Sequence, residues 1–464
     1  MTNRERHPAS FKDPAGYIFM ENGRLLRQVN LEYSGQYTQL RDSGLLTALW
    51  EKKWLLHHQE LPGHTGEDGN AWLVLAPRQI PFNSYPYEWS FDMLKDAALL
   101  TLAINRKAVD YGMILKDASA YNILFDGSQP VFIDTLSFES YDAARPWIAY
   151  RQFCQHFLFP LLINHYKGIE AQQWLQLHHD GLPVQLTAEL LPFRTKFSLG
   201  PALHVHLQNR IAMRHQGEER QVLFSKTKMV QILQHLESVI RSLRYRKRNS
   251  TWNQYYQQSI LSREYLREKE TAFRKLLNGL ETGTAIDLGA NTGNFTLILS
   301  EAGFKVIAVD ADPQAVNELY LAASARNDTK INPMVTNLVN PSPGTGWDNQ
   351  EHQSFLKRGK ADIVVALALI HHLYFTNNIP LESVARQLAK LSKKYCIVEM
   401  IPAHDEKVLQ ISREKKALLA GYTFEAFEHH LTRYFSIVQR VPLLHSDRVL
   451  YLIKKNEEST WPKN

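Results

Sequence analysis

The sequence is poor in cysteine and has no long apolar run. Cys154 and Cys396 are the only cysteines among 464 residues, and they lie far apart in the chain. A disulfide framework is therefore excluded, and so is a zinc module built on cysteines. No stretch approaches the roughly 20 apolar residues that a membrane-crossing helix needs. The polar start, MTNRERHPAS, lacks the apolar core of a signal peptide, so a cytoplasmic location is expected.

The histidines lack the arrangement of a metal site. A helical pattern is predicted over Trp147–Ala212, and its histidines are His156, His165, His178, His179, His204 and His206. None has the spacing and the third ligand that zinc requires. We interpret them as core histidines, and no metal is predicted here or in the second half of the chain.

The length of 464 residues favours two domains, because one ordinary core does not extend that far. With 44% hydrophobic residues, each half can bury a core, and a net charge of +6 is weak support for a polyanionic partner. The predicted parts are an N-terminal domain (1–217), a helical linker and lid (218–280), a C-terminal domain (281–455) and a flexible tail (456–464). No oligomeric state is predicted.

The most informative stretch is Thr284–Asp312, TAIDLGANTGNFTLILSEAGFKVIAVDAD. A buried strand, Ala285–Leu288, runs into a tight glycine turn at Gly289–Gly293, and a helix follows. A second strand, Val306–Val309, then ends in Asp310. This is one βαβ unit whose turn can hold a nucleotide-like ligand and whose acid is placed for a ribose.

The turn favours S-adenosylmethionine (SAM) over a dinucleotide. Asn291 and Asn294 stand where the dinucleotide fingerprint has its second and third glycines. Asp287 lies at the mouth of the turn, where its carboxylate would repel a pyrophosphate but suits the ammonium of a methionine moiety. A generic turn in another Rossmann-like protein is the alternative.

From here the chain resembles the class I SAM-dependent methyltransferases. Their first motif matches at Asp287, Gly289 and Gly293, with Asn291 substituted, and their ribose acid matches Asp310, with Asp312 as the alternative. The resemblance implies an adenine site at Asn337 and Leu338, where an amide replaces the usual acid. The predicted cofactor residues are Asp287, Gly289, Ala290, Asn291, Gly293, Asp310, Asn337, Leu338 and Ala368.

Strands predicted at Asp362–Ala366 and Tyr395–Glu399 continue the sheet. Two closing strands, Phe435–Val441 and Arg448–Ile453, complete seven strands with the reversed last strand typical of class I enzymes. The C-terminal domain is therefore predicted as a doubly wound, seven-stranded Rossmann-like α/β fold.

His371 and His372 follow the fourth strand, where class I enzymes bring the acceptor to the methyl group. Either can supply a base for a hydroxyl acceptor near neutral pH, although one can also merely pack against the cofactor or cap the helix. Glu399 ends the next strand in the same crevice. These three are the predicted catalytic residues. The expected acceptor is an oxygen or nitrogen of a small molecule or glycan.

The first half has a hairpin signal at Gly16–Phe19 and Leu25–Val29. Further on, Leu115–Asp134 resembles the catalytic segment of protein-kinase-like and aminoglycoside-phosphotransferase-like folds. The resemblance implies an α+β domain in which Asp117 accepts a hydroxyl proton. It implies that Asn122 and Asp134 hold magnesium on the phosphates of ATP.

The departures from that pattern favour a degenerate kinase-like domain. No glycine-rich loop precedes Leu25, Arg27 is the nearest cation on a strand, and Leu115 replaces the usual His or Tyr. In the structural alternative, Asp117 and Asn122 only cap a turn and Asp134 only ends a strand.

The phrases LKDASAYN, NPSPGTGW and ALALIHHL resemble a bacterial family of methyltransferases related to a host-specific nodulation protein. By analogy, the family's name suggests a surface or secreted glycan as acceptor. Three alternatives stay open: a bifunctional kinase-methyltransferase using Mg-ATP, a pseudokinase that binds a substrate or partner, and an RNA methyltransferase. The last rests on the basic run Arg241–Arg248, which is more often a solvated helix end. The stretch Trp252–Tyr256 is a candidate lid.

Overall fold

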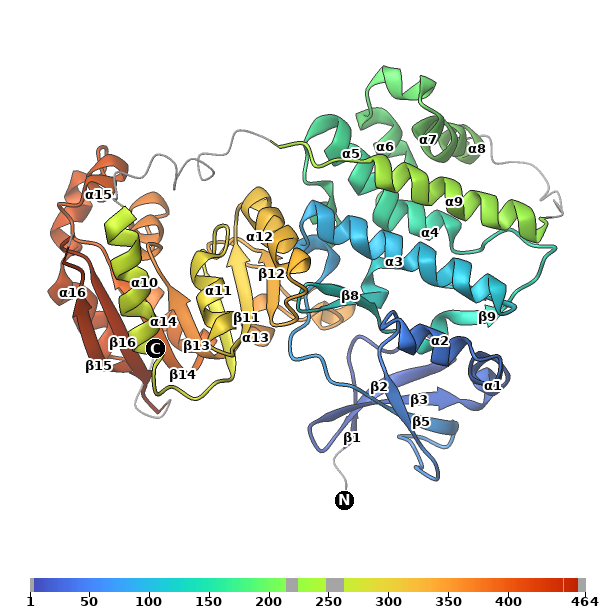
Figure 1. Cartoon of the computed structure of the whole chain (residues 1–464), viewed down its shortest axis with the longest axis horizontal. Helices are drawn as coiled ribbons and strands as arrows, with labels where there is room; N and C mark the ends of the chain where they lie inside the picture. The colour runs from blue at the N-terminus through green and yellow to red at the C-terminus, as the bar shows by residue number, and fades with distance from the viewer. Residues whose placement is uncertain (1–3, 214–223, 248–262, 445, 458–464) are drawn as a thin grey trace. The chain divides into compact units, whose positions relative to one another are not determined.

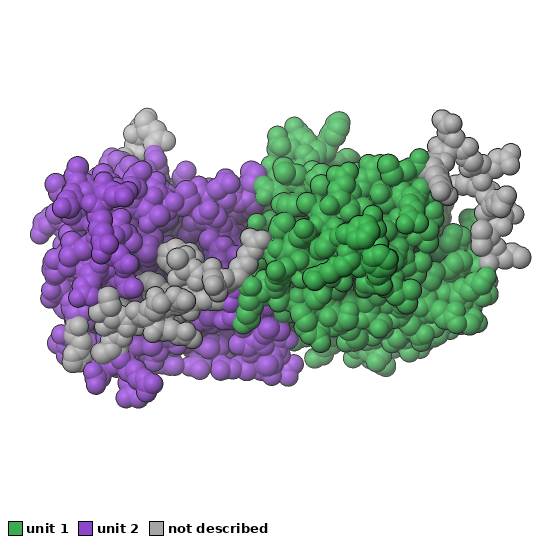
Figure 2. All heavy atoms as spheres, turned by 90° about the horizontal axis from the view of Figure 1, so that it is seen from above, with its two compact units in different colours: residues 1–248, 344–353 green, residues 249–343, 354–464 purple. Residues whose placement is uncertain are grey.

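The computed structural model describes residues 4–213, 224–247, 263–444 and 446–457. They form two compact units, coloured separately in Figure 2. Unit 1 comprises residues 1–248 and 344–353, and unit 2 comprises residues 249–343 and 354–464. The candidate lid Trp252–Tyr256 lies outside the described residues, and the predicted domain limits stay a prediction.

Unit 1 begins with a five-stranded antiparallel sheet in the order β1-β2-β3-β5-β4 (Figure 1). The predicted hairpin is present as β2 and β3, joined at Asn22 and Gly23. Both have left-handed φ angles, 50° and 77°, which a two-residue hairpin turn prefers. The strands are β1 (Arg4–Arg6), β2 (Gly16–Glu21), β3 (Arg24–Asn30), β4 (His58–Leu61) and β5 (Ala71–Pro77). After β3 the chain forms the helices α1 (Ser34–Asp42) and α2 (Leu45–Glu51), which Gly44 separates with a left-handed φ of 84°.

The rest of unit 1 is largely helical. Two short strand pairs, β6 with β9 and β7 with β8, follow the long helix α3 (Phe91–Asp110). Within the helical pattern predicted over Trp147–Ala212, a largely buried helical stretch runs from Tyr150 to Lys167 and contains a π turn at Cys154–Leu158. The bounds are α1 (Ser34–Asp42), α2 (Leu45–Glu51), β6 (Met113–Leu115), β7 (Ile123–Asp126), β8 (Gln129–Phe132), β9 (Phe138–Ser140), α4 (Tyr150–Phe153), α5 (Phe159–Lys167), α6 (Val184–Leu190), α7 (Leu199–Pro201), α8 (Gln208–Met213) and α9 (Lys226–Ser242).

Residues 344–353 come late in the sequence but belong to unit 1. There the ring of Tyr121 stacks on His352, with centroids 4.5 Å apart and 10° between the planes. Lys12 Nζ lies 2.7 Å from Glu351 Oε1. The proline- and glycine-rich loop Asn340–Trp347 leads into this segment.

Unit 2 contains a seven-stranded sheet in the order β12-β11-β10-β13-β14-β16-β15. Its first five strands are parallel, and β16 runs antiparallel to both neighbours, which confirms the predicted sheet with a reversed last strand. The bounds are α10 (Arg263–Leu277), β10 (Thr284–Leu288), α11 (Asn294–Glu301), β11 (Lys305–Asp310), α12 (Pro313–Ala325), β12 (Ile331–Val335), α13 (Phe355–Arg358), β13 (Ala361–Ala366), α14 (Leu381–Leu391), β14 (Ser392–Met400), α15 (Glu406–Ile411), α16 (Phe424–Thr432), β15 (Phe435–Pro442) and β16 (Val449–Lys455).

The core of unit 2 forms because the central strands are apolar on both faces. Helix α10 contributes Phe273 and α11 contributes Phe295, whose rings meet edge to face at 5.2 Å over the sheet. Parallel strands place their carboxyl ends at one edge, where ligands of open α/β sheets bind. Among the described residues, no helix is long and apolar enough to cross a membrane.

Candidate functional site

The turn after β10 is built on left-handed backbone at Gly289, Asn291 and Gly293, with φ of 76°, 49° and 90°. Asparagine tolerates this region better than other side chains, which explains how Asn291 stands in for a glycine. A Cβ at Gly293 would lie 2.3 Å from a methyl carbon of Leu319, so packing requires glycine there. The N–H groups of Gly289 and Ala290 both donate to the carbonyl of Val309, at 2.8 and 3.0 Å.

Asp310, at the end of β11, joins the two loops of the βαβ unit. One carboxylate oxygen accepts from the N–H of Asn291 at 2.8 Å, and the other accepts from the N–H of Asp312 at 2.9 Å. Burial raises the pKa of Asp310, while these two backbone donors oppose the rise. Asp312 instead caps α12 by accepting from the N–H of Gln314. Of the two candidate ribose acids, Asp310 is the one that lies against the glycine turn.

Asp287 is buried within β10, behind the turn. Thr296 on α11 donates its hydroxyl to one carboxylate oxygen at 2.6 Å. Burial, together with the nearby Asp310 carboxylate, raises the pKa of Asp287 to about 6. Thr296 lies in the first turn of α11, directly after the glycine motif. That place in the sequence is the signal by which it could have been predicted as a partner of Asp287.

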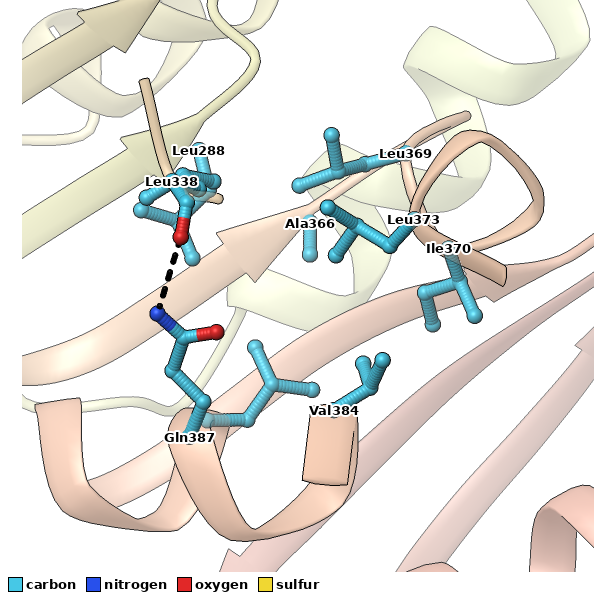
Figure 3. A pocket seen from close by; sticks show the side chains of 9 residues that line it. Leu288, Leu338, Ala366, Leu369, Ile370, Leu373, Val384 and Gln387 are labelled. Carbon is cyan, nitrogen blue, oxygen red and sulfur yellow. Dashed lines mark hydrogen bonds between the residues drawn. The ribbon is translucent and has the colours of Figure 1, made fainter. Parts of the chain in front are cut away.

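The predicted adenine residues follow β12. The side-chain oxygen of Asn337 accepts a hydrogen bond from the N–H of Val339 at 3.0 Å. One of its two lone pairs is therefore already used, and only the other is left for the amino group of adenine. Leu338 lines an apolar pocket that Figure 3 shows between the loop after β13 and helix α14. Gln387 on α14 donates to the carbonyl of Leu338 at 3.4 Å. The pocket is lined by Leu288, Leu338, Ala366, Leu369, Ile370, Leu373, Val384, Gln387 and Leu388.

The loop after β13 carries the two predicted catalytic histidines. Their rings lie 4.1 Å apart at 40°. His371 is 1% exposed, and neither of its ring nitrogens has a hydrogen-bond partner among the described residues. Burial lowers the pKa of His371 well below its usual value, helped by His372, and burial with Lys407 lowers the pKa of His372 to about 4. Both imidazoles are therefore neutral at physiological pH.

Glu399, the third predicted catalytic residue, is fully engaged in a buried charge network. Tyr265 OH donates to one carboxylate oxygen at 2.7 Å, and Lys269 Nζ donates to the other at 2.6 Å. Arg448 Nη1 lies 3.8 Å from Glu399 and its Nε donates to Asp405 at 2.9 Å. Burial alone would raise the pKa of Glu399, but Lys269 and Arg448 hold it below its usual range.

The same carboxylate holds the histidine loop. Ala368 has a φ of 49°, which costs a residue with a side chain roughly 1–2 kcal/mol. Its N–H donates to Glu399 Oε2 at 2.7 Å. A charge-assisted hydrogen bond of this kind offsets the strain. These contacts tie Glu399 to the loop that leads to His371.

In unit 1 the three kinase-like residues occupy one cluster. Arg27 Nη1 is hydrogen-bonded to one oxygen of Asp134, and the Ser137 hydroxyl donates to the other. Asn122 Nδ2 donates to that hydroxyl at 3.3 Å. Although burial opposes it, Arg27 and Ser137 hold the pKa of Asp134 below its usual range. Burial, with repulsion from Asp134, raises the pKa of Asp117, which accepts from the N–H of Ser119 at 2.9 Å.

The basic run is used within unit 1. Arg241 pairs with Glu237 at 2.8 Å, Arg246 Nη1 donates to the carbonyl of Tyr166, and Tyr245 OH donates to Glu170 at 2.9 Å. These contacts fasten the end of α9. Arg248 lies outside the described residues.

The chain is 31% identical over 468 residues to the nodulation protein NoeA of Rhizobium meliloti (strain 1021), covering 97% of this chain and 96% of that protein. The chain belongs to the NoeA family. The family model for a methyltransferase domain matches residues 235–439. That range includes the glycine turn, Asp310, both histidines and Glu399, so the second half of this NoeA-family chain contains a methyltransferase domain.

Two solved structures are similar to part of this NoeA-family chain. The N-methyltransferase NodS of Bradyrhizobium japonicum WM9 is 15% identical and covers 42% of this chain and 99% of NodS, with a TM-score of 0.32. The magnesium protoporphyrin IX methyltransferase of Synechocystis PCC 6803, with bound S-adenosylhomocysteine, is 16% identical. It covers 44% of this chain and 92% of that one, at a TM-score of 0.32. Scores of this size indicate neither an acceptor nor a mechanism.

Glu399→Gln should destabilise unit 2 by about 3–5 kcal/mol, because it leaves the buried charges of Lys269 and Arg448 uncompensated. Since the pKa of Glu399 is lowered in the folded state, its contribution is present above about pH 4.3 and is lost as pH falls through the folded value. Urea unfolding followed by circular dichroism, between pH 7 and pH 3, measures the loss of unfolding free energy in the variant and its dependence on pH.

The matched control is Glu301→Gln, which breaks an exposed pair with Arg274. It should cost at most about 1 kcal/mol. Equal losses in the two variants at pH 7 would contradict the support role of Glu399.

Proposed function

We propose that the protein methylates an oxygen or nitrogen of a small-molecule or glycan acceptor at the loop that follows β13. The observation that carries the proposal is the loop Ala368–His372. It leaves the carboxyl end of the central strand β13 in a strained conformation fixed by Glu399, and it presents two neutral histidines. A neutral imidazole is the form that can take a proton from an acceptor.

The residues present fit SAM. The turn has no side chain at Gly289 or Gly293 that would fill the cradle, and left-handed Asn291 keeps its backbone N–H on Asp310. Asp310 then accepts from the ribose hydroxyls, and the buried carboxylate of Asp287 attracts the ammonium of the methionine end. By the resemblance to class I enzymes, Asn337 and Leu338, in the loop after β12, would lie beside the adenine ring. SAM supplies a methyl group already activated on a sulfonium.

The protein's own contribution is positioning, since an activated methyl group needs chiefly an acceptor held in line with it. The Glu399 carboxylate accepts the N–H of Ala368 and so fixes the start of the loop that carries His371 and His372. The charges of Lys269 and Arg448 lower the pKa of Glu399 and favour its ionised form. Of the two histidines, His372 is partly exposed and His371 is buried. We therefore assign to His372 the role of the base that takes the proton from a hydroxyl or ammonium acceptor. Glu399 is a positioning residue.

The cofactor assignment is tested by calorimetric titration with SAM. Asp310→Asn should weaken binding about 10- to 100-fold, because it removes a charged hydrogen-bond acceptor. The control Asp328→Asn changes an acid beside Ser300, before the amino end of β12, and should bind as wild type does. Absence of SAM binding by wild type, or an unaltered affinity in Asp310→Asn, would contradict the assignment.

The same titration has a pH signature. A cationic ammonium binds ionised Asp287, whose pKa is raised to about 6 mainly by burial. Wild-type affinity should therefore fall below pH 6, by about tenfold per unit at most.

The base is tested by transfer of a labelled methyl group from SAM into an extract of a strain that lacks the protein. His372→Asn should lower the rate about 10²- to 10⁴-fold for an acceptor that must lose a proton. Its SAM affinity should be retained. Because the pKa of His372 is about 4, the wild-type rate should stay flat between pH 6 and pH 8, with its acid limb near pH 4.

The control is His429→Asn, an exposed histidine on α16. If His372→Asn keeps the wild-type rate, the loop acts by positioning alone and His372 is not the base.

For unit 1 we propose a degenerate kinase-like fold that binds a substrate or partner without phosphotransfer. Three features support it: the five-stranded antiparallel sheet, the long helix α3, and the two short strand pairs, whose adjoining loops contain Asp117, Asn122 and Asp134. The pairing of Arg27 with Asp134 favours loss of chemistry, because it occupies the carboxylate that would hold magnesium.

In calorimetry with Mg-ATP, wild type should bind no nucleotide, and Asp117→Asn should leave methyl transfer unchanged. Arg27→Gln frees the carboxylate of Asp134, and any Mg-ATP binding should appear only in that variant. Arg41→Gln, on an exposed pair with Asp42, is the control. Mg-ATP binding by wild type, lost in Asn122→Ala, would instead support the bifunctional kinase-methyltransferase.

A further inference from the structure

The helical segment Leu199–Met213 of unit 1 has an exposed apolar face. It runs through α7, the π turn Ala202–Leu207 and α8 (Figure 1). Phe197 is 80% exposed and Leu199 is 72% exposed. We name this face the apolar ridge; its residues are Phe193, Phe197, Leu199, Leu203, Leu207, Ile211 and Met213.

The spacing of the ridge is regular. Leu199, Leu203, Leu207 and Ile211 recur every four residues, which keeps them on one side of a helix. A buried helix of unit 1 would place such a stripe against the core. Here the stripe faces outward.

The buried face of the segment carries two hydrogen-bonded histidines, on either side of the buried Val205. His204 bonds Tyr150 OH through Nδ1 at 2.6 Å and His235 through Nε2 at 2.8 Å. His206 Nε2 bonds the Thr195 hydroxyl at 2.9 Å. Turning the ridge inward would break these bonds. The outward direction of the leucines is therefore fixed by the hydrogen bonds behind them.

The charges that accompany the ridge are all positive. Between residues 191 and 213 the charged side chains are Arg194, Lys196 and Arg210, and the stretch contains no aspartate or glutamate. All three cations are exposed. Lys196 and Arg210 lie close enough to His206 to lower its pKa together with burial. The nearest acid before the stretch is Glu189, on α6.

We propose that the apolar ridge docks on the surface of an anionic lipid bilayer, with the segment lying in the plane of the interface. Leucine and phenylalanine side chains enter the boundary between headgroups and acyl chains, and flanking arginine and lysine meet anionic headgroups. This surface is separate from methyl transfer and would bring the enzyme to acceptors held at a membrane.

Charge decides against a second copy of the chain as the occupant. A two-fold contact through the ridge would bring Arg194, Lys196 and Arg210 of each copy toward the same face, with no carboxylate between residues 191 and 213 to offset them.

The test is co-sedimentation of the full-length protein with vesicles of phosphatidylcholine, with or without phosphatidylglycerol. Wild type should bind the anionic vesicles at least about tenfold more strongly than the neutral ones. Leu203→Glu with Leu207→Glu should lower that binding at least about tenfold. Arg194→Glu with Lys196→Glu should lose the preference for anionic lipid, as should wild type in high salt.

The matched control is Leu31→Glu, a leucine of unit 1 that is 67% exposed and lies outside the ridge. It should bind vesicles as wild type does, and all variants should keep the wild-type melting temperature and SAM affinity. Equal binding by wild type and the ridge variant would overturn the proposal. A wild-type dimer that becomes a monomer in Leu203→Glu with Leu207→Glu, measured by light scattering, would overturn it in favour of a second copy.

Discussion

The buried carboxylate of Glu399 is the constraint on which the methyltransferase site depends. It is 1% exposed, and such a charge persists only when its partners compensate it. Lys269 comes from the helix before the sheet, and Arg448 comes from just before the last strand. One carboxylate thus fastens three distant parts of unit 2. Because it also accepts the N–H of Ala368, the position of the loop after β13 is tied to the integrity of that network.

Two residues with side chains adopt left-handed backbone at the carboxyl end of the sheet, and each is held by an acid. Asn291 donates its N–H to Asp310, and Ala368 donates its N–H to Glu399. Strained positions persist only where their surroundings over-determine them, and they gather at functional sites. The pairing explains why the glycine of the family motif is dispensable at Asn291, where asparagine tolerates the conformation and Asp310 supplies the hydrogen bond.

The elements that could be predicted from the sequence are mostly those whose residues lie close together along the chain. The βαβ unit and the hairpin at Asn22 and Gly23 depend on neighbouring residues, whereas the reversed last strand was expected from the resemblance to class I enzymes; each is present. The partners of Glu399 could not be read, because Lys269 lies 130 residues away and one sequence does not reveal which charges meet. The predicted catalytic role of Glu399 rested on its strand-end position alone. Position in the fold was predictable, but hydrogen-bond partners were not.

The orientation of the segment Leu199–Met213 could not be predicted from the sequence either. Its periodicity predicts a helix with an apolar face, and an apolar face is ordinarily turned inward. Amphipathic spacing shows that a helix has two faces but not which one meets water. Here His204 and His206 lie on the buried side, where His204 hydrogen-bonds Tyr150 and His235 and His206 hydrogen-bonds Thr195. Residues that the sequence analysis treated as ordinary core histidines therefore determine which side of the segment is presented outward.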